Sequence, residues 1–224
     1  MQGLWNSTIV VRVDEESLAC EGATVARDLA FLVERGVRPI VVAPSPAVAK
    51  SYVRTMNRTA NAAVGLSGCD GALLPAASAD GKIAAVQVGI LRTLTAAGYV
   101  PVIEPTALGI GGDDVDAEPD DIAAAIAAAT EASRAIFFHA AGGVVDPESA
   151  SLVEELTAAE AFALADRPDL DAGLCTAIRA AARGVRAGVG AAQIVDGRVA
   201  HAAVVEFLTS RHIGTQVTGG VFLG

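Results

Sequence analysis

The sequence predicts an α/β protein, an αβα sandwich in which helices cover both faces of a mainly parallel sheet. Short runs of β-branched residues alternate along the chain with Ala-rich stretches of helical length. Such alternation favours right-handed crossovers between parallel strands. Hydrophobic residues make up 52% of the 224 residues and charged residues 19%, which is typical of a packed globular protein. No linker, repeat or change in composition divides the chain, so we expect one domain over residues 1–224.

The first half of the chain is expected to alternate regularly between strands and helices. The expected strands are Thr8–Val13, Pro39–Ala43, Ala63–Leu66 and Tyr99–Glu104, and the expected helices are Glu21–Arg35, Ala47–Ala60 and one between Gly81 and Gly98. Gly36 follows the first helix, where a glycine commonly ends a helix. The third strand leads into the turn GLSGCDG, whose glycines permit tight backbone conformations.

The second half of the chain continues the pattern. The expected helices are Asp120–Glu131, Ala158–Ala165 and Gly173–Arg186, the expected strands are Ala135–His139 and Ala192–Val195, and the segments His201–Leu208 and Thr215–Val221 close the chain. The acidic stretch 113–121 precedes a helix. Pro119 suits the first turn of that helix, and Asp120 and Asp121 suit the positive end of its dipole. We therefore interpret this stretch as a solvated loop that caps a helix.

Charge and cysteine content exclude several classes of function. The net charge of −10 argues against a nucleic-acid or anionic-membrane partner. The three cysteines are far apart and have no zinc-site spacing. The first residues lack the basic start and apolar stretch of a signal peptide, and no apolar run reaches the length of a membrane span. We expect a cytoplasmic protein with no membrane partner.

Four segments resemble acetylglutamate kinase, of the amino acid kinase family. They are GLSGCDG (65–71), AAGYVPVIEP (96–105), PDDIAAAIAAA (119–129) and GVGAAQIVDGRVAHAAVVEFLTSRHIGTQV (188–217). The four segments follow the family's order, and together they span residues 65–217, about two thirds of the chain. The resemblance implies a sheet of about eight strands, with ligands at the carboxyl ends of the strands.

The resemblance also implies how the chain is organised. The amino-acid substrate is expected over an N-terminal half of about residues 1–107, and ATP over a C-terminal half of about residues 108–224. It further implies a homodimer that pairs through the N-terminal half and extends one sheet across the two-fold axis. ATP and Mg²⁺ are the cofactors to expect if kinase activity is retained.

The sequence departs from the family at the end of the first strand. The family has a Lys and two glycines that approach the transferring phosphoryl group, and this chain has Arg12, then Asp14 and Glu15. Arg12 keeps the positive charge. Two carboxylates beside a phosphate repel it, and their side chains block a close backbone approach. The alternative is that Asp14 and Glu15 simply begin a solvated loop.

The second strand leads to another departure. The family's HGGGP motif offers backbone N–H donors, whereas this chain has Pro44, Ser45 and Pro46, and proline has no N–H. The alternative is a rigid turn in which Ser45 caps the next helix. The chain then passes almost directly from residue 57 to the turn at Gly65. We therefore expect the family's substrate lid to be deleted.

Several catalytic positions of the family are also changed. Its lysines fall at Cys69 and Ala177, and the Asp expected to organise them falls at Ala140. The chain has two lysines, Lys50 and Lys82, and neither matches a catalytic position. Catalysis in this family depends on cations that neutralise charge on the transferring group. We expect Cys69 to be an unreactive thiol, because its sequence neighbours are acidic.

The site predictions combine these observations. The candidate catalytic residues are Arg12, Asp120 and His139, the candidate cofactor-binding residues are Ser67, Gly68, Asp196 and Gly197, and the candidate substrate-binding residues are Ser45 and Glu118. The backbone donors of Ser67 and Gly68 are expected to point into the crevice, as the family's turn implies. The alternative for His139 is a structural role, as a histidine at a strand end whose ring nitrogens are hydrogen-bonded within the protein. No metal site is predicted, because the acidic stretch lacks EF-hand spacing.

Three functions remain in competition at this point. The first is a pseudokinase that serves as a binding or regulatory module, with an amino-acid pathway enzyme or a small molecule as its partner. The second is an enzyme with remodelled chemistry, either a kinase for another substrate or a non-kinase. The third is a storage protein for a small ligand or a cation. The acidic crevice favours a cationic or neutral polar ligand over a phosphate chain.

Overall fold

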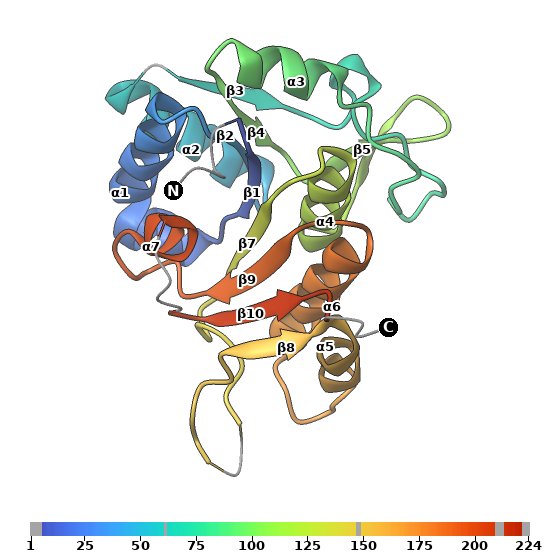
Figure 1. Ribbon diagram of the computed structural model, residues 1–224. Coiled ribbons are helices and arrows are strands. Elements are labelled where there is room, and N and C mark those ends of the chain that lie inside the picture. The colour runs from blue at the N-terminus through green and yellow to red at the C-terminus, as the bar shows by residue number, and fades with distance from the viewer. Residues whose placement is uncertain (1–5, 61, 147–148, 209–212, 221–224) are drawn as a thin grey trace.

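The central sheet of the computed structural model has the predicted architecture (Figure 1). The structure describes residues 6–60, 62–146, 149–208 and 213–220, so the end of the expected segment at Val221 lies outside the described residues. Eight strands run in the order β3-β4-β2-β1-β7-β9-β10-β8, and all neighbours are parallel except β9 and β10. The strands are β1 (Thr8–Arg12), β2 (Arg38–Val42), β3 (Ala63–Leu66), β4 (Val100–Ile103), β7 (Arg134–Phe138), β8 (Glu155–Thr157), β9 (Ala191–Val195) and β10 (Thr215–Thr218).

Helices cover both faces of this sheet, as Figure 1 shows. One face carries α1 (Glu15–Glu34), α2 (Pro46–Thr59) and α7 (Ala202–Leu208), and the other carries α3 (Gly89–Ala96), α4 (Pro119–Ala129), α5 (Ala158–Ala165) and α6 (Ala172–Arg186). Side chains of β1 alternate between the two cores. Ile9 and Val11 belong to the core under α1, and Val10 belongs to the core under α4.

Helix α1 begins at Glu15 and not at Glu21. Asp14 is its N-cap, and the Asp14 carboxylate accepts a hydrogen bond from Ser17 N–H at 2.7 Å. The alternative in which Asp14 and Glu15 begin a solvated loop is therefore wrong. The local reason is that a capping carboxylate satisfies a backbone donor that the first turn leaves open.

Helix α3 is shorter than the predicted helix between Gly81 and Gly98. The segment before α3 pairs with an earlier stretch instead, because Ala77 N–H donates to Lys82 O and Ala84 N–H donates to Pro75 O. Gly81 has a φ of +75°, and a Cβ there would lie 1.8 Å from Asp116 O. This contact requires a glycine and ends any helical continuation towards residue 81.

A small antiparallel sheet, absent from the predicted elements, lies beside the main one. It pairs β5 (Thr106–Leu108) with β6 (Asp114–Asp116), and a short 3₁₀ helix, η1 (Asp70–Ala72), lies near it. Part of the acidic stretch is therefore a strand and not a loop. The expectation for the start of α4 is confirmed, since Pro119 begins the helix and Asp120 and Asp121 lie in its first turn.

The connections place the helix starts at one edge of the sheet. Strand β1 leads into α1, β2 leads into α2, and β7 ends next to the start of α6, so backbone N–H groups face the carboxyl ends of the strands. Residues 60–62 alone join α2 to β3. Among the described residues, no helix is long and apolar enough to cross a membrane.

Candidate functional site

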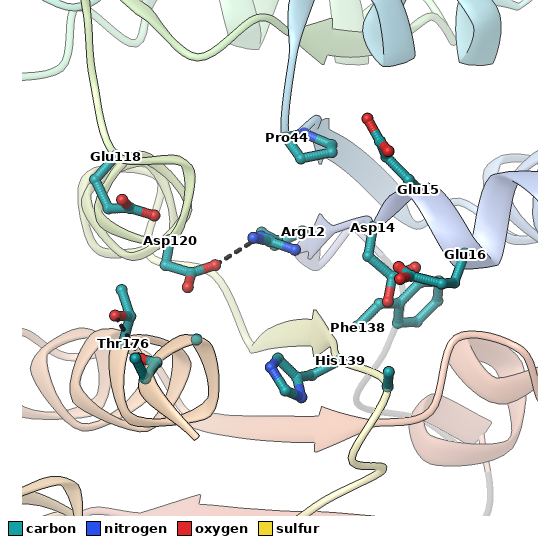
Figure 2. Close-up of a pocket in the computed structure, with 13 residues that line it drawn as sticks. Arg12, Asp14, Glu15, Glu16, Pro44, Glu118, Asp120, Phe138, His139 and Thr176 are labelled. Atoms are coloured by element: carbon teal, nitrogen blue, oxygen red, sulfur yellow. Dashed lines mark hydrogen bonds and ion pairs between the residues drawn. The ribbon is translucent and has the colours of Figure 1, made fainter. Parts of the chain in front are cut away.

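A cavity of about 470 Å³ opens at the carboxyl ends of β1, β2 and β7 (Figure 2). It is lined by Arg12, Asp14, Glu15, Glu16, Pro44, Glu118, Asp120, Phe138, His139, Ala140, Ala172, Gly173 and Thr176. We call it the acidic cavity. Its place agrees with the rule that ligands of open α/β sheets bind outside the carboxyl ends of the strands. Four of the predicted site residues meet here: Arg12, Glu118, Asp120 and His139.

An ion pair between Arg12 and Asp120 crosses the acidic cavity. Arg12 Nε lies 2.6 Å from Asp120 Oδ1, and the Asp120 side chain is only 4% exposed. Figure 2 shows Asp120 pointing from the start of α4 towards Arg12 at the end of β1. Burial raises the pKa of Asp120 to about 6, against the opposing effect of the Arg12 charge. The guanidinium of Arg12 is thus already matched to a carboxylate.

A buried network fixes the acidic wall formed by the start of α1. The Ser17 hydroxyl donates to Asp14 O at 3.0 Å and lies 2.9 Å from the hydroxyl of Tyr52 on α2. Tyr52 is fully buried, and this burial raises its pKa. The network holds Asp14 in its capping position, so one N–H at the start of α1 is used by the protein's own carboxylate. Sequence reasoning missed Ser17 and Tyr52, which lie 35 residues apart.

The charges that line the acidic cavity are strongly unequal. Among its described lining residues, Arg12 carries the one fixed positive charge, and the carboxylates are Asp14, Glu15, Glu16, Glu118 and Asp120. Glu15 and Glu16 are exposed at its mouth, whereas Asp14 and Asp120 are buried. A field of this sign attracts cations and repels phosphate groups. Glu16 was not among the predicted site residues, although its place beside Glu15 in the sequence was visible.

His139 lies at the end of β7 with both ring nitrogens engaged. Ala141 N–H donates to His139 Nδ1 at 3.1 Å, so the geometry assigns the proton to Nε2. Nε2 lies 3.5 Å from Asp171 Oδ1, and Asp171 also caps α6 by accepting from Leu174 N–H. In this arrangement the lone pair of Nδ1 is not available to accept a proton from a ligand. The alternative of a satisfied histidine therefore fits the geometry better than a general base.

The turn after β2 offers the acidic cavity no backbone N–H from Pro44 that could bind a phosphate. Pro44 lines the cavity and has no N–H. Ser45 does not line it, because its hydroxyl accepts from Val48 N–H at 3.3 Å and caps α2. The capping alternative for Ser45 is thus confirmed. On the opposite side, Ala140 lines the cavity, while Ala177 is buried in the core and its neighbour Thr176 lines the cavity instead.

The sequence predicted that the backbone N–H groups of Ser67 and Gly68, in the turn after β3, point into the crevice, and this prediction is wrong. Ser67 N–H donates to Asp70 Oδ2 at 2.7 Å, and Gly68 N–H donates to Thr106 Oγ1 at 3.2 Å, so neither donor points into the acidic cavity. Gly68 is a glycine because a Cβ there would lie 2.1 Å from Thr106 O. The partner of Gly68 lies 38 residues away, on a strand that the sequence did not reveal.

The predicted nucleotide turn at Asp196 and Gly197 also lies outside the lining of the acidic cavity. Asp196 forms an ion pair with Arg198 at 2.8 Å, which lowers the pKa of Asp196. A Cβ on Gly197 would lie 2.6 Å from the ring of Phe138. This turn is therefore packed against the end of β7, with its carboxylate already paired.

The described residues do not form a metal centre. Within residues 6–60, 62–146, 149–208 and 213–220, no group of three or more His, Cys, Asp or Glu side chains is arranged to hold a metal ion. The Cys69 thiol contacts the Asp114 carboxylate, and this hydrogen bond raises the pKa of Cys69 to about 11. The prediction of an unreactive thiol agrees with this arrangement.

Comparison with known proteins gives consistent relatives. The amino acid kinase family matches residues 47–196. An acetylglutamate kinase of Geotalea uraniireducens is 35% identical over 190 residues, covering 77% of this chain and 65% of the relative. One of Synechococcus sp. (strain WH7803) is 39% identical over 181 residues, covering 77% and 62%. The chain thus spans less than two thirds of the length of these relatives.

Solved structures show the same fold. N-acetylglutamate synthase from Neisseria gonorrhoeae, complexed with coenzyme A and N-acetyl-glutamate, superposes with a TM-score of 0.84 at 19% identity, over 99% of this chain and 61% of that one. Carbamate kinase from Giardia lamblia, bound to AMP-PNP, gives 0.67 at 12% identity, over 98% and 100%. With the family match over residues 47–196, the chain belongs to the amino acid kinase family.

Proposed function

We propose that this protein is a non-catalytic member of the amino acid kinase family, a pseudokinase whose acidic cavity binds a cationic or neutral polar ligand. One observation carries the proposal. The single fixed cation that lines the described part of the cavity, Arg12, is ion-paired at 2.6 Å with the buried Asp120. A phosphate chain entering the cavity would have to compete with that carboxylate for the guanidinium.

The remaining lining residues do not fit the phosphates of ATP. Asp14 uses its carboxylate to cap α1, so the position where a phosphate would approach the helix start already holds negative charge. Pro44 offers no backbone donor. The two lysines lie elsewhere, because Lys50 and Lys82 line other cavities. Apart from Arg12, no described side chain that lines the acidic cavity carries the fixed positive charge that phosphoryl transfer requires.

Binding without kinase chemistry also fits one solved structure of this fold. The N-acetylglutamate synthase from Neisseria gonorrhoeae has been solved in complex with coenzyme A and L-arginine, and its name is not that of a kinase. L-Arginine carries the kind of cationic group that the acidic cavity would attract. It is therefore a reasonable first probe for this chain.

Kinase activity is the second candidate function. It is favoured by the curated relatives, which are named acetylglutamate kinase at up to 39% identity, and by Arg12, which places a guanidinium at the end of β1. If the protein is a kinase, a ligand must neutralise or displace Asp120, because only then is the Arg12 guanidinium free to contact a phosphate. The substrate would differ from that of the relatives, because only residues 60–62 connect α2 to β3 and leave no room for a lid.

Calorimetric titration separates the two candidates. L-Arginine and putrescine are expected to bind saturably, whereas ATP with Mg²⁺ is expected not to bind. The double variant Asp14→Asn with Glu118→Gln is expected to bind both amines more weakly. Arg58→Gln serves as a matched control, because Arg58 lies in the last turn of α2 and outside the acidic cavity. Saturable binding of ATP with Mg²⁺ that Arg12→Met abolishes would contradict the proposal and favour the kinase.

Homodimer formation is a further part of the proposal and rests on the family resemblance. Asn57 constrains its geometry, since the Asn57 side chain bonds both Ala63 N–H (2.8 Å) and Ala63 O (3.0 Å) on the free edge of β3. A capped edge disfavours strand addition. We therefore expect any pairing to use helix surfaces rather than the edge of β3. Light scattering at micromolar concentration is expected to give twice the monomer mass, and a monomer would contradict this part.

A further inference from the structure

A second cavity, of about 360 Å³, lies between α2 and the edge strand β3. It is lined by Ala49, Lys50, Val53, Arg54, Gly65, Leu66, Ser67, Asp70 and Glu104. We call it the edge cavity. It shares no lining residue with the acidic cavity, so binding at the two places can be changed independently. Its volume lies at the lower end of the range of small-ligand sites.

The edge cavity has walls of opposite charge. Lys50 and Arg54 lie four residues apart on α2, so their side chains are neighbours on one helix face. Asp70 and Glu104 line the same cavity from the turn after β3 and the end of β4. In the described chain, none of these four side chains forms an ion pair with another. Two cations and two anions thus face one space and remain available to a ligand.

The backbone of β3 adds a donor and an acceptor that have no partner among the described residues. Val100 N–H donates to Ala62 O and Glu104 N–H donates to Leu66 O, so alternate residues of β3 face β4 and the others face outwards. The outward residues are Ala63 and Gly65. Asn57 satisfies both backbone groups of Ala63, which leaves those of Gly65, and Gly65 lines the edge cavity.

Hydrogen bonds from Ser67 hold one carboxylate of the anionic wall, that of Asp70, in place. Asp70 Oδ2 accepts from Ser67 N–H at 2.7 Å and from the Ser67 hydroxyl at 3.2 Å. Glu104 is half-buried, and its backbone N–H is bonded to Leu66 O at 2.8 Å. The Asp70 carboxylate is therefore preorganised although the residue is exposed, and the exposed side chains of Lys50 and Arg54 can adjust to a ligand.

We infer that the edge cavity binds a small zwitterion of the α-amino acid class. The ligand carboxylate lies between Lys50 and Arg54 and accepts a hydrogen bond from Gly65 N–H. The ligand ammonium lies against Glu104 and Asp70. A dicarboxylate or a diamine of similar size satisfies one wall and is repelled by the other, so the cavity selects a ligand that carries both charges. This site is separate from the proposed function of the acidic cavity.

Calorimetry and backbone NMR with L-glutamine test this inference, with succinate and putrescine as the half-matched probes. L-Glutamine is expected to bind saturably and to shift the amide signals of Gly65 and Ser67. Lys50→Gln with Arg54→Gln is expected to weaken binding at least tenfold. Arg58→Gln, on the same helix but outside the cavity, is the matched control and should bind like the unmodified protein.

A second variant tests the cavity without touching its charges. A Cβ on Gly65 meets only Val53 Cγ2, at 3.5 Å, so Gly65→Val is compatible with the strand and places its methyl groups in the cavity. It should reduce L-glutamine binding while circular dichroism stays unchanged. The inference is overturned if L-glutamine does not shift the amide signals of Gly65 and Ser67, or if the Lys50 and Arg54 variant binds it normally. It is also overturned if succinate or putrescine shifts those two signals at an equally low concentration; putrescine bound in the acidic cavity leaves them unchanged, because neither residue lines that cavity.

Discussion

The acidic cavity and the edge cavity both border the carboxyl ends of strands in one sheet. They differ in whether their charged side chains are buried and paired or exposed. In the acidic cavity the central groups are buried and paired, as Arg12 with Asp120 and Asp14 with the start of α1. In the edge cavity, Lys50 and Arg54 are exposed and free of ion pairs within the described chain. Removing one partner of a buried pair destabilises the fold, and the buried carboxylate makes stability depend on pH, whereas exposed charges respond to ligands and salt. Substitutions in the two cavities should therefore have different consequences.

The largest effect on stability is expected from Asp120→Ala. Removing one partner of a buried ion pair leaves the other charge uncompensated, and we expect a loss of about 3 kcal/mol of unfolding free energy. Urea denaturation measures it. The double variant Arg12→Met with Asp120→Leu is the control and should recover much of the loss. A single variant as stable as the unmodified protein would show that the ion pair is not buried in solution.

The pH dependence of stability should reveal the same carboxylate. The pKa of Asp120 is raised from 3.8 to about 6 in the folded state, so folded protein binds more protons than unfolded protein between these values. The part of the stability that comes from proton binding by Asp120 is therefore greatest below about pH 4 and is lost as the pH rises through about 6. The difference in stability between the unmodified protein and Asp120→Asn should shrink from pH 4 to pH 7 by up to about 3 kcal/mol. A constant difference would contradict the raised pKa.

A smaller effect is expected from Tyr52→Phe. This change removes the hydroxyl that lies 2.9 Å from Ser17 Oγ in a fully buried position, and we expect a loss of about 1 kcal/mol. The control is Tyr99→Phe, because Tyr99 is 42% exposed and should cost almost nothing. A double-mutant cycle with Ser17→Ala should show coupling between the two positions. Additive losses would mean that the two hydroxyls do not interact.

The sequence predicted the order of the main strands and helices well, because the spacing of hydrophobic residues and the positions of glycines determine these elements locally. Strands such as β3, and helix α5 at Ala158–Ala165, lie where they were predicted. The start of α1 was missed because the acidic residues before Glu21 are as suitable for a solvated loop as for a helix with a capping Asp14. Strands β5 and β6 were missed because each is three residues long.

The candidate site was predicted in part, for a topological reason. Four predicted residues meet because they lie at strand ends or helix starts beside the carboxyl ends of the parallel strands: Arg12, Glu118, Asp120 and His139. The Arg12–Asp120 pair was not predicted, nor was the use of Ser67 and Gly68 N–H groups within the protein. These contacts join residues far apart in the sequence, such as Gly68 and Thr106. A single sequence carries no signal for such pairs.

Trapping of an acyl phosphate with hydroxylamine tests the central claim most directly. Purified protein is incubated with N-acetyl-L-glutamate, ATP and Mg²⁺, and hydroxamate is measured with an acetylglutamate kinase assayed in parallel. The account predicts no product above background, because Asp120 occupies Arg12 and carboxylates surround the place of the phosphoryl group. A turnover in the ordinary range of about 1–100 s⁻¹, abolished by Arg12→Met, would contradict it.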